Sequence, residues 1–151
     1  MKLLITFIIA FTLLGCASSE NDSYGSLYLR SEFTYWQATD LYKFKQNEEK
    51  NALYLRALIK ADGNPYHFKI ADKKWSQDRN CGYSSITNKK VKLNQWVELE
   101  CNYNYSKEST MPITRALEFD PIVSGEFVFE LAINKDGRAS KIRVSRIVTK
   151  K

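Results

Sequence analysis

The stretch Glu126–Asn134, EFVFELAIN, decides the fold class because apolar and polar side chains alternate along it. Successive side chains of a β-strand point to opposite faces, so this pattern predicts a strand with one buried face. The inward face would carry four apolar residues, Phe127, Phe129, Leu131 and Ile133. The turn sequence Asn134–Gly137, NKDG, then predicts a last strand whose inward residues are Ile142 and Val144.

Similar short stretches occur along most of the chain before Glu126. The further predicted strands are Leu27–Phe33, Leu41–Gln46, Ala52–Ala61, Tyr66–Ala71, Ala116–Phe119 and one or two strands over Val91–Leu93 and Trp96–Tyr103. The turn sequence Asp62–Pro65 predicts that the strands on either side of it pair as a hairpin. Trp96 lies in an alternating run and is predicted to be in the core.

Length and composition indicate a single domain. The chain has 151 residues, of which 44% are hydrophobic and 13% aromatic, and this suits one core built from strands. No stretch of the mature chain keeps the three-to-four spacing of an amphipathic helix. About eight short strands with regular turn signals predict an all-β fold, an antiparallel β-sandwich over residues 27–149.

Residues 1–15 have the features of an export signal. Lys2 precedes the apolar run Leu3–Leu14, which is short for a membrane span, and Leu13–Cys16, LLGC, ends it. This ending resembles the lipobox of bacterial lipoproteins, in which the cysteine carries the lipid. The resemblance implies that Cys16 is acylated, with palmitate among the expected chains, and Ala17 in place of aspartate implies the outer membrane. Residues 16–26 would form a flexible linker; an ordinary signal peptide or uncleaved anchor is the alternative.

Charge and cysteine content limit the partners. The formal net charge is +6, but the cations are spread along an exported chain without a nucleic-acid motif, so we expect no nucleic-acid partner. Anionic lipid head groups or cell-wall polymers fit this charge better.

With Cys16 lipidated, Cys81 and Cys101 are expected to form a disulfide. A zinc site is less consistent with two cysteines and the single His67, and we expect no metal or cofactor.

Two tryptophans in polar loops are the candidate binding residues. In Tyr66–Trp75, YHFKIADKKW, Phe68 and Ile70 share one strand face and Lys69 lies on the other, with Trp75 in the loop that follows. Trp36 has a similar setting in FTYWQATD. Indole rings and a lysine at the loop edges of a β-domain predict a surface on which sugar rings stack.

LYLRSEFTYW, residues 27–36, followed by YHFKIADKKW resembles the early-set immunoglobulin-like modules of pullulanases, amylases and branching enzymes, and the glycogen-binding modules of kinase regulatory subunits. The likeness runs from Leu27 to about Val148. It implies an immunoglobulin-like sandwich that binds α-glucans, with carbohydrate-binding residues Trp36, Lys69 and Trp75. Ser31 and Thr34 depart from the family's usual glycine and asparagine, and the spacing from Lys69 to Trp75 is about one residue shorter.

Other interpretations of these residues remain open. Trp36 and Trp75 would instead cap the core, and Lys69 would be a solvated strand lysine. Asp72 and Asp78 are carboxylates, but a sandwich of this size rarely supplies the cleft of a glycosidase, so we expect no enzyme. Two functions therefore compete: a carbohydrate-binding lipoprotein, and an envelope assembly lipoprotein that binds a protein partner. Exposed coplanar indoles would favour the first, and a long unpaired edge or apolar patch the second.

Overall fold

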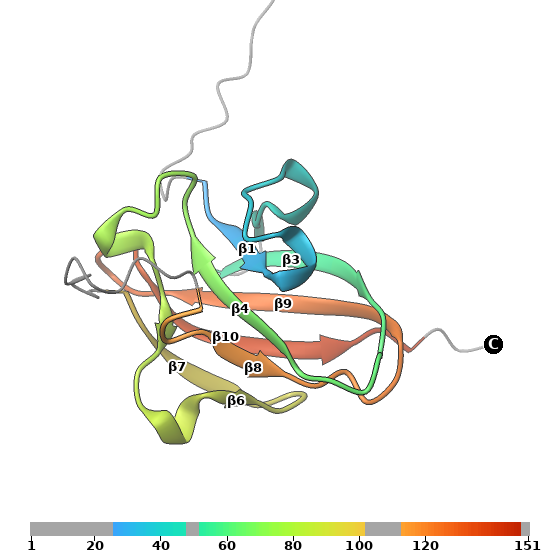
Figure 1. Ribbon diagram of the computed structural model, residues 1–151. Helices are drawn as coiled ribbons and strands as arrows, with labels where there is room; N and C mark the ends of the chain where they lie inside the picture. The colour runs from blue at the N-terminus through green and yellow to red at the C-terminus, as the bar shows by residue number, and fades with distance from the viewer. Residues whose placement is uncertain (1–25, 48–51, 102–112, 149–151) are drawn as a thin grey trace, which may run out of the picture.

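The computed structural model describes residues 26–47, 52–101 and 113–148, which form two stacked β-sheets (Figure 1). The small sheet has the strand order β1-β4-β8-β6, and the large sheet has the order β2-β3-β9-β10-β7-β5. The strands are β1 (Tyr28–Ser31), β2 (Lys45–Asn47), β3 (Ala52–Ile59), β4 (Tyr66–Ala71), β5 (Gly82–Tyr83), β6 (Lys90–Val91), β7 (Trp96–Glu100), β8 (Leu117–Phe119), β9 (Gly125–Ile133) and β10 (Ala139–Arg146). The predicted signal peptide, Cys16 and most of the linker lie outside the described residues.

Short 3-10 helices are the remaining regular elements of these three ranges. They are η1 (Glu32–Thr34), η2 (Asp40–Tyr42), η3 (Gln77–Arg79) and η4 (Ile86–Asn88). None of the helices within the described ranges is long and apolar enough to cross a membrane. All the strand pairs are antiparallel except β6–β8, which is parallel.

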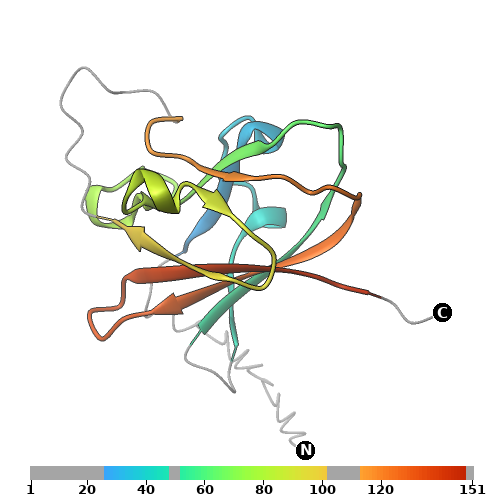
Figure 2. The same cartoon turned by 90° about the horizontal axis from the view of Figure 1, so that it is seen from below.

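The core lies between the two sheets, which separate into layers when seen from below (Figure 2). The predicted inward residues of β9 are buried, and so are Ile142 and Val144 of β10. The turn after β9 closes the predicted hairpin, because the Asn134 amide donates to the Arg138 carbonyl oxygen at 2.9 Å. Edge-to-face ring contacts join the layers: Phe68 of β4 and Phe129 of β9 have their ring centroids 5.6 Å apart. The β-sandwich fold is confirmed.

The predicted hairpin between Ala52–Ala61 and Tyr66–Ala71 is wrong. Strand β3 pairs with β2 and β9, whereas β4 pairs with β1 and β8 in the other sheet. Each strand has one apolar face, so placing the two in facing sheets buries both faces in the same core. The six residues from Lys60 to Pro65 are long enough to cross the ~10 Å between packed sheets.

The core position predicted for Trp96 is also wrong, because 41% of its surface is exposed on the outer face of β7. Trp96 and Val97 are adjacent, and a strand directs only one of them inward. Cys101 selects the direction: it points inward to bond Cys81, so Leu99 and Val97 share its face. Trp96 therefore faces outward.

The predicted disulfide is present between Cys81 and Cys101. Cys81 pairs through its backbone with Ile70 of β4, and Cys101 directly follows β7. Cys81 also directly precedes β5, which pairs with β7 in the large sheet. The bond therefore joins neighbouring segments of the large sheet, at the point where Cys81 also pairs with the small sheet, and both cysteines are buried.

Candidate functional site

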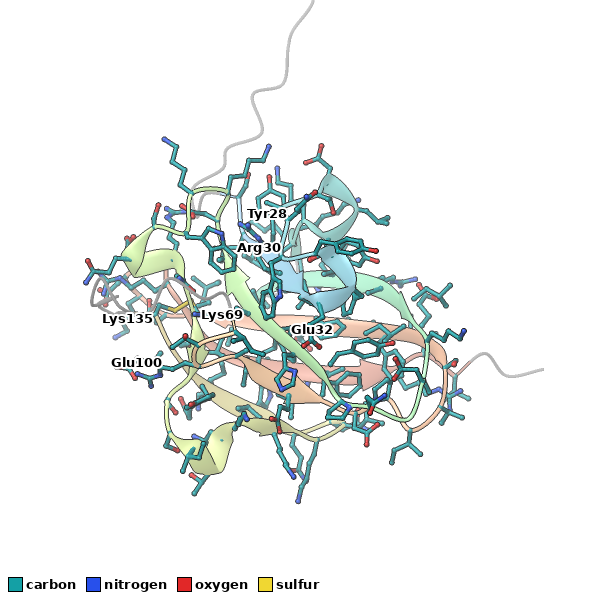
Figure 3. The ribbon with its side chains drawn as sticks, viewed as in Figure 1. Tyr28, Arg30, Glu32, Lys69, Glu100 and Lys135 are labelled. Carbon is teal, nitrogen blue, oxygen red and sulfur yellow. A yellow bond between two sulfur atoms is a disulfide. The ribbon has the colours of Figure 1, made fainter. Side chains whose placement is uncertain are left out.

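The candidate site lies on the outer face of the β1–β4 pair, where Arg30 and Lys69 are direct cross-strand neighbours (Figure 3). Side chains in such a pair have Cβ atoms about 4.5–5.5 Å apart, so two adjacent cations repel unless other groups compensate them. Both are nevertheless buried, with 6% of Arg30 and none of Lys69 exposed. Backbone carbonyl groups from the loops that cover this face supply the compensation, as the following contacts show.

The loop after β1 turns back sharply and brings Trp36 over the strand. Ser31 caps η1: its hydroxyl accepts from the Phe33 amide at 3.2 Å, and the Ser31 amide donates to the Thr34 hydroxyl at 2.9 Å. The Trp36 amide then donates to the Ser31 carbonyl oxygen at 2.8 Å. Trp36 has a φ of 58°, in the left-handed region. Ser31 and Thr34, which stand where the modules that the sequence resembles usually have glycine and asparagine, therefore build this turn through a capping box.

The loop after β4 folds over the same face through Asp72. Its carboxylate accepts from the amides of Lys74, at 3.0 Å, and Ser76, at 2.9 Å. Burial alone would raise the pKa of Asp72, but the hydrogen bonds from Ser76 and Lys74 outweigh it and hold the pKa below its usual value. Trp75, within this turn, also has a φ of 58°. The carboxylate of Asp72 thus stabilises the loop, which fits a structural role and not that of a catalytic acid.

Arg30 joins the two loops. Its Nε donates to the Trp36 carbonyl oxygen at 2.6 Å, and one terminal nitrogen donates to the Asp72 carbonyl oxygen at 2.7 Å. Its guanidinium lies 4.0 Å from the centre of the Trp75 ring. Burial lowers the pKa of Arg30 and the nearby Asp72 charge opposes this, but an arginine in a protein stays protonated. One side chain therefore fixes both tryptophan-bearing loops.

Trp36 and Trp75 are both half-buried. Neither indole lies in the core cluster, and neither is a fully exposed platform. Arg30 occupies one face of Trp75, so only the opposite face of that ring is available to a ligand.

Lys69 is buried beneath this face. The interpretation of Lys69 as a solvated strand lysine is wrong, because its side chain has no exposed surface and Nζ donates to the Thr114 carbonyl oxygen at 3.1 Å. Burial lowers the pKa of Lys69 to about 8, and the charge of Arg115 acts in the same direction. A sugar would reach Nζ only after the covering groups moved, so direct sugar binding by Lys69 stays a prediction. In this conformation the residue supports the face from below.

A chain of polar side chains continues along the same face from η1 to β8. His67 Nδ1 lies 3.0 Å from Glu32 Oε1, and His67 Nε2 lies 3.3 Å from Glu118 Oε1. Lys89 Nζ lies 2.5 Å from Glu118 Oε1. The hydrogen bond from Lys89 lowers the pKa of Glu118, with smaller contributions from the Lys89 charge and His67 that outweigh its burial. These paired donors and acceptors extend the outer face that carries Arg30 and Lys69 toward β8.

Sequence reasoning missed the residue that organises this face, Arg30. A signal was present in the sequence, because the alternation of side chains places Arg30 on the outward face of its strand, as it places Lys69 in β4. The pairing of β1 with β4 brings them together, and that pairing was not predicted because β4 was expected to pair with β3.

Comparison with models of protein families and with curated proteins gives no match. Among solved structures, the chain is similar to a starch-binding domain, described as the ligand-induced structure of AmyP-SBD. The two share 15% identity with a TM-score of 0.50, over 98% of this chain and 96% of that chain. At this identity the likeness shows a shared β-sandwich fold.

Proposed function

We propose that this protein is a membrane-tethered, non-catalytic lipoprotein that binds an α-glucan or another polysaccharide through Trp36 and Trp75. The observation that carries this proposal is the position of Arg30, which holds both tryptophan-bearing loops on one sheet face. The likeness in fold to a starch-binding domain supports it.

The geometry suits a preformed binding surface. Arg30 restrains Trp75 from one side, which leaves the other side of the indole for a sugar ring. A ring that is already ordered loses less conformational entropy on binding than a mobile ring. Stacking on two half-buried indoles buries a limited area, so the expected affinity is modest. A binding free energy of about −4 to −8 kcal/mol corresponds to dissociation constants from millimolar to micromolar.

The membrane tether is proposed from the N-terminal sequence, which ends its apolar run with LLGC. An acylated Cys16 would hold the chain to the envelope, with the outer membrane as the proposed site. The residues between Cys16 and β1 would let the sandwich reach a polysaccharide near that membrane.

The test is retention of the soluble domain, from Ser19 onward, in gels that contain amylose or other α-glucans, together with a glycan array. Trp36→Ala and Trp75→Ala should each weaken binding by roughly 1–2 kcal/mol. Trp96→Ala is the matched control, because Trp96 is an exposed tryptophan of the other sheet. If the parent binds no glycan, or if Trp96→Ala weakens binding as much as the other two changes, the proposal is wrong.

A second candidate function is protein binding, favoured by one apolar hollow. Leu93, Phe119 and Ile122 line a hollow of ≈ 390 Å³ beside β6 and β8, and 86% of Ile122 is exposed. An exposed apolar cluster of this kind suits a protein partner. Ile122→Ser would then abolish co-purification of an envelope protein while Trp36→Ala left it unchanged.

A further inference from the structure

Trp96 is an exposed indole that projects from a strand of the large sheet and not from a loop. It lies in β7 opposite Arg143 of β10, and 41% of its surface is exposed. The neighbouring Val97 is buried in the core, so the indole is on the outer face of the sheet. Strand β5 pairs only with Leu99 and Glu100 of β7. Among the described residues, β7 is therefore the edge of the sheet at Trp96, and a ligand can reach the ring across that edge.

An ion pair beside the ring restrains it. Arg143 pairs with Glu130 of β9, and its guanidinium lies 4.7 Å from the centre of the Trp96 ring. The arrangement is similar to that of Arg30 and Trp75 on the small sheet, where the distance is 4.0 Å. A cation held over one side of an indole leaves the other side for a ligand. Because the ring is already ordered, it loses less conformational entropy on binding than a mobile ring would.

A second ion pair lies next to the first. Lys141 of β10 is opposite Glu98 of β7, and Lys141 Nζ lies 2.8 Å from Glu98 Oε1. Both side chains are exposed. We call Trp96 and the residues of the two ion pairs, Glu98, Glu130, Lys141 and Arg143, the Trp96 platform. Each cation of the platform is paired with a carboxylate of the platform, so these groups suit the hydroxyl groups of a neutral ligand.

The small apolar area of the platform favours a carbohydrate over a protein as its occupant. Trp96 is the one apolar member of the platform, and the other four members are charged. A stable protein–protein interface buries about 800 Å² on each partner and has an apolar centre. A sugar ring needs only one aromatic face together with hydrogen-bonding groups beside it.

A second aromatic residue on the same face indicates the direction of a bound chain. Tyr54 of β3 lies at the level of Trp96, because the strand registers connect the two through Arg143 and Glu130. The neighbouring Leu55 is buried, so Tyr54 faces outward. Adjacent strands lie about 4.8 Å apart, and three such spacings separate the two rings by roughly 14 Å. A ligand that contacts both rings is therefore extended across the strands. A β-linked glucan forms such an extended ribbon, whereas an α-linked glucan of the starch type coils.

We propose that the Trp96 platform binds a neutral, extended β-linked polysaccharide. One sugar ring stacks on the free side of Trp96, its hydroxyl groups hydrogen-bond to the ion pairs of the platform, and the chain crosses the strands toward Tyr54. This site goes beyond the proposed function, because it uses the opposite sheet and a glycan of another linkage class. The protein would then hold two different glycans at once, one on each outer face.

The test measures retention of the full chain in native gels that contain hydroxyethylcellulose, a neutral β-linked glucan, with a non-ionic detergent that has no sugar head group. Trp96→Ala should weaken binding about tenfold. Trp96→Phe should bind more tightly than Trp96→Ala, because it keeps an aromatic ring for stacking. Trp36→Ala is the matched control, since it removes an indole from the small-sheet face, and it should bind as the parent does.

Melting curves show whether Trp96→Ala is folded; if it is not, Trp96→Thr, which keeps strand propensity, replaces it with the same expected loss. A parent that hydroxyethylcellulose does not retain would overturn the proposal. Equal losses in Trp36→Ala and Trp96→Ala would overturn it too, since the platform would then not be a separate site. Retention by carboxymethylcellulose alone, unchanged in Trp96→Ala, would show that net positive charge explains binding, and it would also contradict the proposal. Amylose does not enter this test, so failure here leaves the Trp36 and Trp75 proposal intact.

Discussion

The guanidinium of Arg30 lies 4.0 Å from the centre of the Trp75 ring, and the same side chain donates to the Trp36 carbonyl oxygen at 2.6 Å. The positions of the two loops are therefore coupled through one residue, although Trp36 and Trp75 are far apart in the sequence. The cation is buried among carbonyl groups, where its contacts are stronger than they would be in water.

Arg30→Lys should therefore disrupt both loops although it keeps the charge. An ammonium group does not reproduce the planar fork that reaches two carbonyl groups and stacks on an indole. We expect a loss of roughly 1–3 kcal/mol in the free energy of unfolding, because buried carbonyl groups lose their donor. Urea denaturation measures this loss, and tryptophan fluorescence in the native state reports the change at the rings. If Arg30→Lys matched the parent in both measurements, Arg30 would not be the connecting residue.

The strand faces were predictable because their signal is local. Phe127 and Phe129, or Ile142 and Val144, repeat with period two, and their burial follows from alternation alone. The pairing of strands was less predictable: nothing in Asp62–Pro65 distinguishes a tight hairpin from a crossing between sheets. The contact of Arg30 with both tryptophan-bearing loops could not be predicted, since it depends on the pairing of β1 with β4.

Removal of the Cys81–Cys101 disulfide should destabilise the sandwich. The two cysteines are 20 residues apart, and opening a loop of that length should cost about 3 kcal/mol on the chain-entropy model. Replacement of both cysteines by serine would lower the melting temperature, and reduction of the parent would give a similar decrease. Two free thiols in protein taken from the envelope would contradict this prediction.

The lipid anchor is tested by Cys16→Ser. The thiol is the acylation site that the LLGC sequence indicates, and each methylene buried in a bilayer contributes ~0.8 kcal/mol. The variant should incorporate no labelled palmitate and should leave the membrane fraction. Ser18→Ala is the control, because it lies outside the lipobox and should fractionate as the parent does. Unchanged fractionation of Cys16→Ser would mean that another segment anchors the protein.

Lys69 should make the stability of the protein depend on alkaline pH. Its pKa is about 8 in the folded chain, lowered by burial and then by the Arg115 charge, and near 10.4 in an unfolded chain. Below pH 8 both states are protonated, so the full cost of burying the cation is present. Between pH 8 and about 10.4 the folded state has released a proton that the unfolded state retains, and stability rises with pH. The gain over this range is roughly 3 kcal/mol.

Lys69→Met isolates this contribution, because methionine fills a similar volume without a titrating group. The free energy of unfolding in urea should rise between pH 8 and 10 more steeply for the parent than for Lys69→Met. Contributions from groups that both proteins share cancel in the difference. Lys73→Met, at an exposed position after β4, should follow the parent curve. Parallel curves for the parent and Lys69→Met would show that Lys69 is not buried as a titrating group. A steeper parent curve would show that Lys69 is buried as a cation below pH 8, and that this burial lowers the free energy of unfolding.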